Sequence, residues 1–385
     1  MISKDEVERL SLQHGVPLPS VEKDYVMGWL LWAIAANPWL GRNLVLKGGN
    51  CLRKLYFPDT RFSDDLDFTA YRLDAPDAFR DQLRDICERV ASASGIEFDL
   101  HRTAVESKDT PDPDCKALDG RVYFKGFAGD SSLTMRIKFD VSDYERIVLP
   151  VQHHSILHEY SDAATVSPVR VAAYSLEEIL AEKLRSWIQR TRSRDLFDVV
   201  KIIHSGKIPV VKQNILSAFL KKTLFKGIAV KGKQEMLVEE KFGHIEGSWL
   251  QTIICPKNAL IVASNAIKLF RDFIETLFDT VTLGAMGEPL AVSAVRYAVR
   301  PIIREAIIQA GRARQLIRMR YNGRDRDVEP YSFKYKIRKQ DGRGIEYFYG
   351  WDRTRDNTIK SFFVHEIQSV SILPTKFIPR EVVEF

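Results

Sequence analysis

The chain has 385 residues, which is long enough for two or three domains with separate hydrophobic cores. Hydrophobic residues make up 45% and charged residues 28%, and this balance excludes a disordered, collagenous or membrane-embedded chain. The longest apolar stretch, residues 29–36, is too short to cross a bilayer, and the charged N-terminus predicts no secretory signal. We therefore expect a cytoplasmic protein with no membrane partner.

The net charge of +6 is unevenly distributed. Between Arg312 and Arg380 the chain carries 16 Lys and Arg residues against 8 Asp and Glu residues. This excess is typical of a segment with an anionic partner, although solvated basic loops are equally common. Both interpretations stay open for the C-terminal segment.

Hydrophobic spacing and turn residues predict the first elements. Ser20 is expected to cap a core helix over residues 21–37, and Gly48-Gly49 is expected to form a turn between a buried strand and a short helix. The other early elements are strands over 43–47 and 66–70 and helices over 50–56 and 75–93. Residues 133–142 alternate strictly between apolar and polar, which predicts a strand with one polar face.

Later elements divide the rest of the chain. Helices are expected over residues 175–191, 193–204 and 263–280. From residue 316 the pattern changes to short strands, separated by the hairpin signals Asn322-Gly323 and Asp341-Gly342. The predicted fold class is mixed α+β, with a catalytic domain over 1–205, a helical domain or linker over 206–311 and a small all-β barrel over 312–385.

Asp65 and Asp67 flank Leu66 at the start of a predicted strand, so both carboxylates point to the same face. Two carboxylates together repel each other unless a cation is present, and Mg²⁺ prefers such oxygen ligands together with phosphate oxygens. Asp140, on the polar face of the later strand, is a candidate third ligand. For an isolated pair of this kind, a solvated acidic turn is the more common interpretation.

The upstream glycine pair adds to this signal. Backbone N–H groups at Gly48 and Gly49 can hold a triphosphate, although glycine pairs more often simply make turns. The glycine pair and Arg53, followed by the segment 63–68 (Ser-Asp-Asp-Leu-Asp-Phe), resemble the pattern of the polymerase-β-like nucleotidyltransferase superfamily.

Lys183 lies within the apolar stripe of the helix expected over 175–191. A buried ammonium is costly without an anion, so this lysine should reach solvent, bind a phosphate, or pair with Asp195 or Asp198 on the next helix.

Four segments in order, 47–56, 61–68, 138–142 and 178–198, resemble the AbiEii/AbiGii toxin family of nucleotidyltransferases. The resemblance implies a bacterial toxin–antitoxin or phage-defence protein that transfers NMP from an NTP to an acceptor, and the expected acceptor is the 3′ end of tRNA, which some members of the family modify. It also implies Mg²⁺, with Mn²⁺ as an alternative, and a cognate antitoxin. The implied site residues are Gly48, Gly49, Arg53 and Ser63 for the nucleotide, Asp65, Asp67 and Asp140 for the metal and catalysis, Lys183 for the triphosphate and Asp195 as a supporting carboxylate.

The segment 313–377 resembles a WYL domain, an SH3-like barrel that binds nucleic acid or other anionic ligands in bacterial defence regulators. The namesake tripeptide stands here as Glu346-Tyr347-Phe348. An aromatic barrel core with solvated basic loops is the alternative. The candidate nucleic-acid-binding residues are Arg318, Arg320, Arg353, Arg355 and Lys360.

Two other functions remain open at this point. One is a nucleic-acid-responsive regulator that binds nucleotide without catalysis, and the intact carboxylate pair argues against it. The other is a transferase that uses the same fold to modify a protein or a small molecule, which the sequence does not separate from RNA modification.

Overall fold

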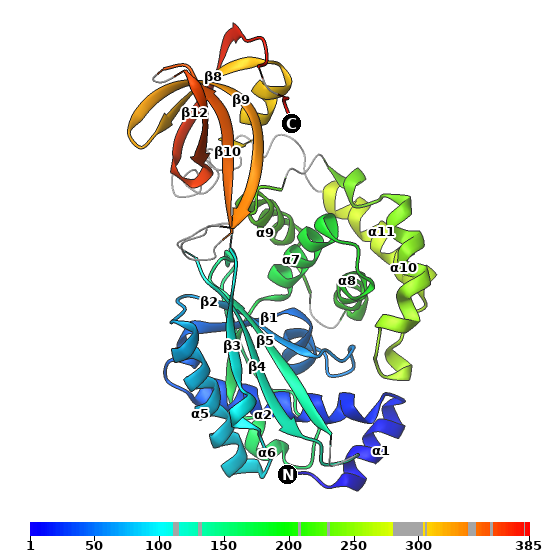
Figure 1. Ribbon diagram of the computed structural model, residues 1–385. Coiled ribbons are helices and arrows are strands. Elements are labelled where there is room, and N and C mark those ends of the chain that lie inside the picture. The colour runs from blue at the N-terminus through cyan, green and yellow to red at the C-terminus, as the bar shows by residue number, and fades with distance from the viewer. Residues whose placement is uncertain are drawn as a thin grey trace. The chain divides into compact units, whose positions relative to one another are not determined.

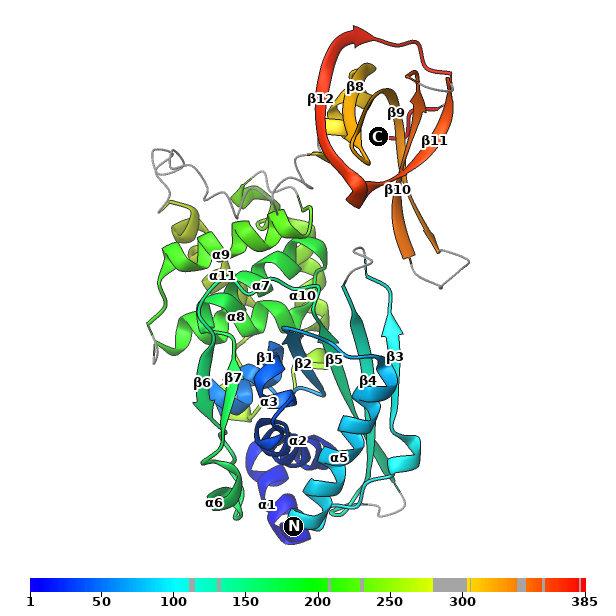
Figure 2. The ribbon, with the colours of Figure 1, turned by 90° about the vertical axis from the view of Figure 1, so that its left-hand side faces the viewer.

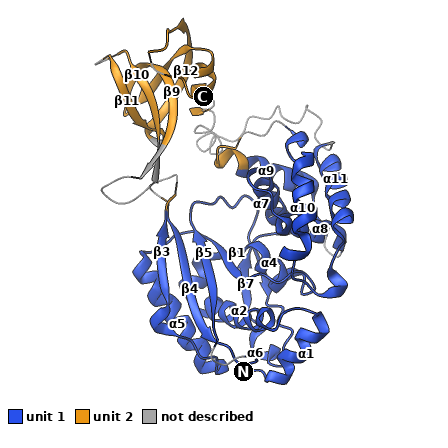
Figure 3. Ribbon diagram, turned by 45° about the vertical axis from the view of Figure 1, so that its right-hand side comes forward, with its two compact units in different colours: residues 1–108, 116–222, 231–282 blue, residues 109–115, 223–230, 283–385 orange. Residues whose placement is uncertain are grey.

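The computed structural model divides the chain into two compact units, which are described separately (Figure 3). The first comprises residues 1–108, 116–222 and 231–282, and the second comprises residues 109–115, 223–230 and 283–385. The structure describes all residues except 111–114, 130–132, 207–208, 229–231, 280–302, 305, 338–343, 355–356 and 381.

A seven-stranded mixed sheet forms the centre of the first unit (Figure 1), and its strand order is β3-β4-β5-β2-β1-β7-β6. β2 pairs in parallel with β5 and antiparallel with β1, and β1 in turn pairs in parallel with β7. The strands are β1 (Leu44–Lys47), β2 (Asp65–Ala70), β3 (Ala104–Lys108), β4 (Ala117–Lys125), β5 (Thr134–Ser142), β6 (Gln152–Ser155) and β7 (Arg170–Ala173). The predicted fold class is therefore confirmed as mixed α+β.

Two long helices pack against this sheet and against each other (Figure 2). α2 (Leu18–Ala36) contacts β5 and β7, and it is buried almost all round. α5 (Pro76–Ser94) contacts β3 and β4 through the apolar stripe that its sequence predicts. The remaining helical segments up to residue 166 are α1 (Lys4–His14), α3 (Leu40–Asn43), α4 (Gly48–Cys51), the π-helix η1 (Leu52–Tyr56), η2 (Leu100–Arg102) and α6 (Ala163–Val166).

Two local predictions were wrong. The core helix begins at Leu18 with Pro19 in its first turn, so Ser20 lies inside it and does not cap it. Proline fits the first turn of a helix because its missing N–H has no intrahelical partner there. Gly48 and Gly49 do not form a turn, because α4 starts at Gly48 and continues directly into the π-helix.

A helical layer completes the first unit. α7 (Leu176–Gln189) is capped by Ser175, whose hydroxyl accepts from the Glu178 amide at 3.2 Å. α10 (Glu239–Thr252) and α11 (Ala263–Asp279) both contact α8 (Ser193–Ser205) and belong to the first compact unit. The other segments are α9 (Lys212–Phe225), η3 (Lys233–Glu235) and η4 (Lys257–Ala259).

The second unit contains a five-stranded antiparallel sheet in the order β11-β10-β9-β8-β12. Its strands are β8 (Gln315–Tyr321), β9 (Arg324–Ile337), β10 (Gly344–Asp352), β11 (Thr358–Phe363) and β12 (Ile367–Lys376), with η6 (Val364–Glu366) before the last. Asn322 and Gly323 have φ of +49° and +73°, as their hairpin signal requires, whereas Asp341-Gly342 lies outside the described residues. The sheet is consistent with the predicted small β domain, and its WYL character stays a prediction.

Candidate active site

The carboxylates of β2 and β5 lie side by side. In the parallel ladder Asp67 is in register with Asp140, and Asp65 is in register with Lys138. Because side chains alternate along a strand, the apolar neighbours Leu66 and Phe139 are buried on the opposite face of the sheet from these acids. The structure thus brings together two acids that the sequence analysis singled out from distant segments.

Burial and this pairing of carboxylates both make ionisation of Asp67 less favourable. Burial raises the pKa of Asp67 to about 6, the neighbouring Asp140 and Asp65 carboxylates add to the rise, and the Lys47 ammonium opposes it. Burial also raises the pKa of Asp65. A cation bound here would relieve the repulsion.

Asp119 on β4 extends the row of carboxylates, since it is in register with Asp140 across the antiparallel β4–β5 ladder. Lys108 lies between the two acids, with its Nζ 2.7 Å from Asp140 and 3.5 Å from Asp119. Lys138 Nζ is 3.3 Å from Asp119. Sequence reasoning missed Asp119 and Lys108 because it predicted no strands over residues 104–108 and 117–125.

The glycine pair is required by close packing. Gly48 has φ of +75°, and a Cβ there would clash with the Asp67 carboxylate. A Cβ at Gly49 would lie 2.6 Å from Arg61 Nη2 and 2.9 Å from Ser63 Oγ. The absence of side chains at both positions therefore lets the backbone of α4 approach β2.

The structure does not bring Arg53 to this place. Its Nε donates to Asp24 at 2.7 Å, its Nη1 donates to the carbonyls of Pro58 and Thr60, and its guanidinium stacks on the ring of Phe62 at 3.6 Å. Asp24 was too far away in the sequence to be recognised as its partner. Arg53 is a buried, paired cation that does not line the cavity described below, and its role at the phosphates stays a prediction.

Ser63 stands near the glycine pair without lining the cavity described below. Its carbonyl accepts from Asn50 Nδ2 at 3.3 Å, and the same amide group donates to the Asp65 carbonyl at 2.6 Å. Asn50 therefore fixes the loop that leads into β2, and Ser63 belongs to this support.

Lys183 forms both of the ion pairs that the sequence allowed. Its Nζ lies 2.9 Å from Asp195 and 2.7 Å from Asp198. Although burial disfavours the ammonium, the two carboxylates raise the pKa of Lys183 above its ordinary value. Arg61 pairs with Asp198 through two bonds of 2.8 Å, and Arg190 lies 3.3 Å from Asp195. Asp195 thus supports Lys183 and Arg190.

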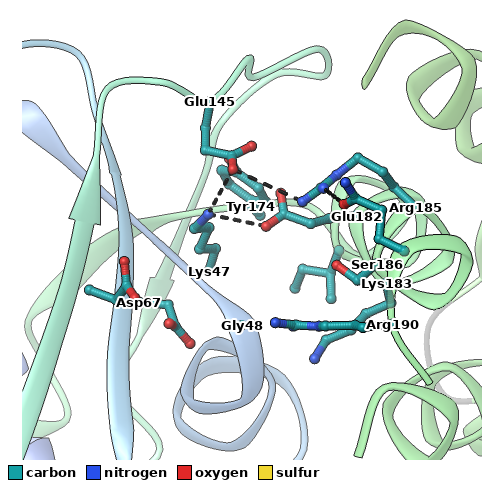
Figure 4. Close-up of a pocket in the computed structure, with 13 residues that line it drawn as sticks. Lys47, Gly48, Asp67, Glu145, Tyr174, Glu182, Lys183, Arg185, Ser186 and Arg190 are labelled. Carbon is teal, nitrogen blue, oxygen red and sulfur yellow. Dashed lines mark hydrogen bonds and ion pairs between the residues drawn. The ribbon is translucent and has the colours of Figure 1, made fainter. Parts of the chain in front are cut away.

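A cavity of about 240 Å³ is lined by Asp67, Asp140 and Lys183 among the predicted site residues (Figure 4). Asp67 lies on its strand side, and Lys183 of α7 and Arg190, directly after α7, lie on the opposite side. Lys47 also lines it, and the Lys47 ammonium is 3.1 Å from Glu182 and 3.8 Å from Glu145. Sequence reasoning missed Lys47, although its place directly before the glycine pair was a usable signal.

The cavity offers oxygen donors suited to a hard divalent cation. No three His, Cys, Asp or Glu side chains converge into a complete metal centre in the described part of the chain. Of the three predicted ligands, Asp67 and Asp140 line this cavity and Asp65 does not, and the metal site stays a prediction.

Four basic candidates in the second unit each face an acid. Arg318 forms two bonds of 2.8 Å with Asp327, and Arg320 lies 3.9 Å from Asp325. Arg353 Nε lies 2.6 Å from Glu329, Lys360 Nζ lies 3.8 Å from Asp352, and Arg355 is outside the described residues.

The comparisons with known proteins include a family match and several similar solved structures. The family model of the nucleotidyl transferase AbiEii toxin, type IV toxin–antitoxin system, matches residues 29–254, which is more than half of the chain. Similar solved structures are MenT4, a nucleotidyltransferase toxin of Mycobacterium tuberculosis H37Rv (17% identity, 77% of this chain, 94% of that chain, TM-score 0.48), and JHP933 of Helicobacter pylori (17%, 71%, 100%, 0.42).

None of the curated proteins searched matches this chain. Among the described helices, none is long and apolar enough to span a membrane.

The extent of the family match decides the assignment: the chain belongs to the AbiEii family of nucleotidyltransferase toxins of type IV toxin–antitoxin systems.

Proposed function

We propose that this protein is a metal-dependent toxin that transfers NMP from an NTP to the 3′ end of tRNA. The observation that carries the proposal is the alignment of Asp67 with Asp140 on neighbouring parallel strands, at a cavity lined on its other side by Lys183 and Arg190. Family membership supports nucleotidyl transfer, a bacterial setting and a cognate antitoxin.

Asp65, Asp67 and Asp140 are the residues that would hold Mg²⁺ or Mn²⁺. Such an ion would neutralise the triphosphate and polarise the α-phosphorus. The ammonium groups of Lys47 and Lys183 and the Arg190 guanidinium would orient the phosphates by charge-assisted hydrogen bonds.

In the proposed reaction, the acceptor hydroxyl oxygen forms a bond to the α-phosphorus as the bond to the pyrophosphate oxygen breaks. The hydroxyl proton passes to Asp140, which acts as the general base. Lys108 pairs with this carboxylate. For Asp140 to accept the proton, the Lys108 ammonium must move away or share the carboxylate oxygen with the proton.

The test is incubation of the purified protein with each α-³²P-labelled NTP, Mg²⁺ and total bacterial RNA, followed by a denaturing gel. We expect label on tRNA-sized RNA with the wild-type protein and none with Asp67→Asn. Asp64→Asn is the matched control, because the neighbouring Asp64 carboxylate is exposed and pairs with Lys23 at 2.9 Å.

Absence of labelled RNA with every NTP would overturn the RNA acceptor. Label on protein or on small molecules instead would favour the broader transferase function. Loss of toxicity in Arg318→Ala/Arg320→Ala but not in Asp67→Asn would favour a regulator that binds nucleotide without catalysis.

A further inference from the structure

Lys222 on α9 is a buried cation outside the cavity, with its side chain only 2% exposed. Its Nζ lies 2.7 Å from Glu178 and 3.1 Å from Glu182, and it donates to the carbonyl of Arg146 at 2.9 Å. A buried ammonium is costly unless it is fully paired, and these three acceptors match its three N–H donors. The Lys222 ammonium is therefore a positive charge that is buried in the core and does not line the cavity.

The partners of Lys222 lead to the cavity. Glu182 places one carboxylate oxygen on Lys222 and the other on Lys47, so it bridges two ammonium groups. The Glu178 carboxylate accepts from the amides of Val148 and Leu149, at 3.1 and 2.8 Å. Together with the bond from Lys222 to the Arg146 carbonyl, these contacts hold the loop that carries Glu145.

Glu182 and Glu145, which these contacts hold in place, are the two acids that contact Lys47. Glu182 and Glu145 face its ammonium from α7 and from the loop, and Figure 4 shows both contacts converging on Lys47. Because Glu182 also pairs with Lys222, its negative charge is divided between the Lys222 and Lys47 ammonium groups. Removing Lys222 would take away the ammonium that Glu178 and Glu182 share, and the added negative charge would make the cavity more repulsive to a triphosphate.

We propose that Lys222 is a positioning residue for nucleotide binding: it holds Glu182 and the 145–149 loop so that the Lys47 ammonium is presented to the triphosphate. This inference rests on the proposed nucleotidyl transfer. Lys222 acts through Glu182 and the loop and touches no reacting atom.

The experiment compares Lys222→Met and Lys222→Arg with Lys201→Met in the full chain. Lys201 is the matched control, because its side chain is 12% exposed and pairs with Asp59 at 2.9 Å, yet it does not line the cavity. The measurements are KM and kcat for the NTP that labels RNA with the wild type, and the Kd of its α,β-methylene analogue by calorimetry.

We expect Lys222→Met to raise KM and Kd about tenfold, equivalent to about 1.4 kcal/mol of binding free energy, with kcat changed less than about threefold. Lys222→Arg should restore most of the affinity, since it keeps the charge. Lys201→Met should leave KM and Kd unchanged.

Unchanged Kd and KM in folded Lys222→Met would overturn the inference, as would an equal change in Lys201→Met. If Lys222→Met does not fold, Lys222→Gln keeps amide donors without the charge and is measured in its place, with the same expected rise. If wild-type protein binds the analogue but transfers nothing, the proposed transfer fails while the Kd comparison still decides the role of Lys222.

Discussion

The cavity of the first unit and the sheet of the second unit differ in how their charged side chains are arranged. At the cavity, Asp67 lies beside Asp140, and burial raises its pKa to about 6. On the sheet, Arg318 meets Asp327 at 2.8 Å, and Arg326 meets the buried Asp352 at 2.5 Å. Both regions pair their cations with acids, as Lys183 does with Asp195 at 2.9 Å. At the cavity one carboxylate also lies beside another, and a bound cation would balance their repulsion.

The largest effect should come from removing the repelled carboxylate. We expect Asp67→Asn to lower the transfer rate by about 10³-fold, because positioning and charge stabilisation of the phosphates would be lost. Its Tm should be unchanged or higher, since a carboxylate with a raised pKa opposes folding at pH 7. Transfer assays and thermal denaturation, with Asp64→Asn as control, check this. A fall in Tm that parallels the fall in activity would contradict it.

Asp24→Asn tests the opposite arrangement, a fully balanced buried cluster. Asp24 accepts from Arg53 at 2.7 Å, from Lys54 at 2.6 Å and from the Tyr160 hydroxyl at 2.7 Å. Neutralising it leaves two buried cations unpaired, so we expect a loss of about 3–5 kcal/mol of unfolding free energy in denaturant titrations. KM for NTP should stay constant in the folded fraction. A raised KM with unchanged stability would instead assign Arg53 to the phosphates.

The same cluster predicts how stability depends on pH. Although burial opposes ionisation, Arg53 and Lys54 hold the pKa of Asp24 well below its ordinary value. A carboxyl whose pKa is lowered in the folded state stabilises it above the unfolded pKa of about 3.9, and this contribution is lost as pH falls further. Thermal denaturation between pH 3 and 7, at about half-unit steps, should show Tm falling below about pH 4. The fall of Tm should be shallower in Asp24→Asn. Equal slopes of Tm against pH in the two proteins would show that Asp24 does not contribute to the fall.

The smallest effect is expected on the second unit. Arg318→Ala/Arg320→Ala removes two exposed cations that already face Asp327 and Asp325, so Tm should hardly change. If the sheet docks RNA, KM for RNA should rise about threefold and become less dependent on salt, with KM for NTP unchanged. Arg80→Ala on α5, whose arginine pairs with Asp77 at 2.8 Å, is the control. Equal KM for RNA in both variants would exclude this surface from docking.

Local patterns predicted the parts of the site that depend on strand and helix periodicity. The period of two placed Asp65 and Asp67 on one face, and the alternation over 133–142 placed Asp140 on a polar face. Helical spacing identified Lys183 as a lysine in an apolar stripe that needs an anion, and the structure supplies Asp195 and Asp198.

Buried charges with distant partners could not be predicted in this way. Arg53 follows the glycine pair as a phosphate ligand would, but its partner Asp24 comes from α2, and no local pattern links the two. Lys222 lies in a segment of mixed composition, and only its contacts with α7 reveal a role. Tertiary packing decides which cations face a cavity and which hold the core together.

The parallel pairing of β2 with β5 also sets when the site can form. β4 and β5 are neighbours in the chain and can pair early, but Asp67 meets Asp140 only after the long connection between β2 and β5 is closed. Lys183 and its partners on α7 and α8 come later still along the chain. A growing or truncated chain that lacks these helices has no complete cavity, so the proposed toxicity depends on late, long-range steps of folding.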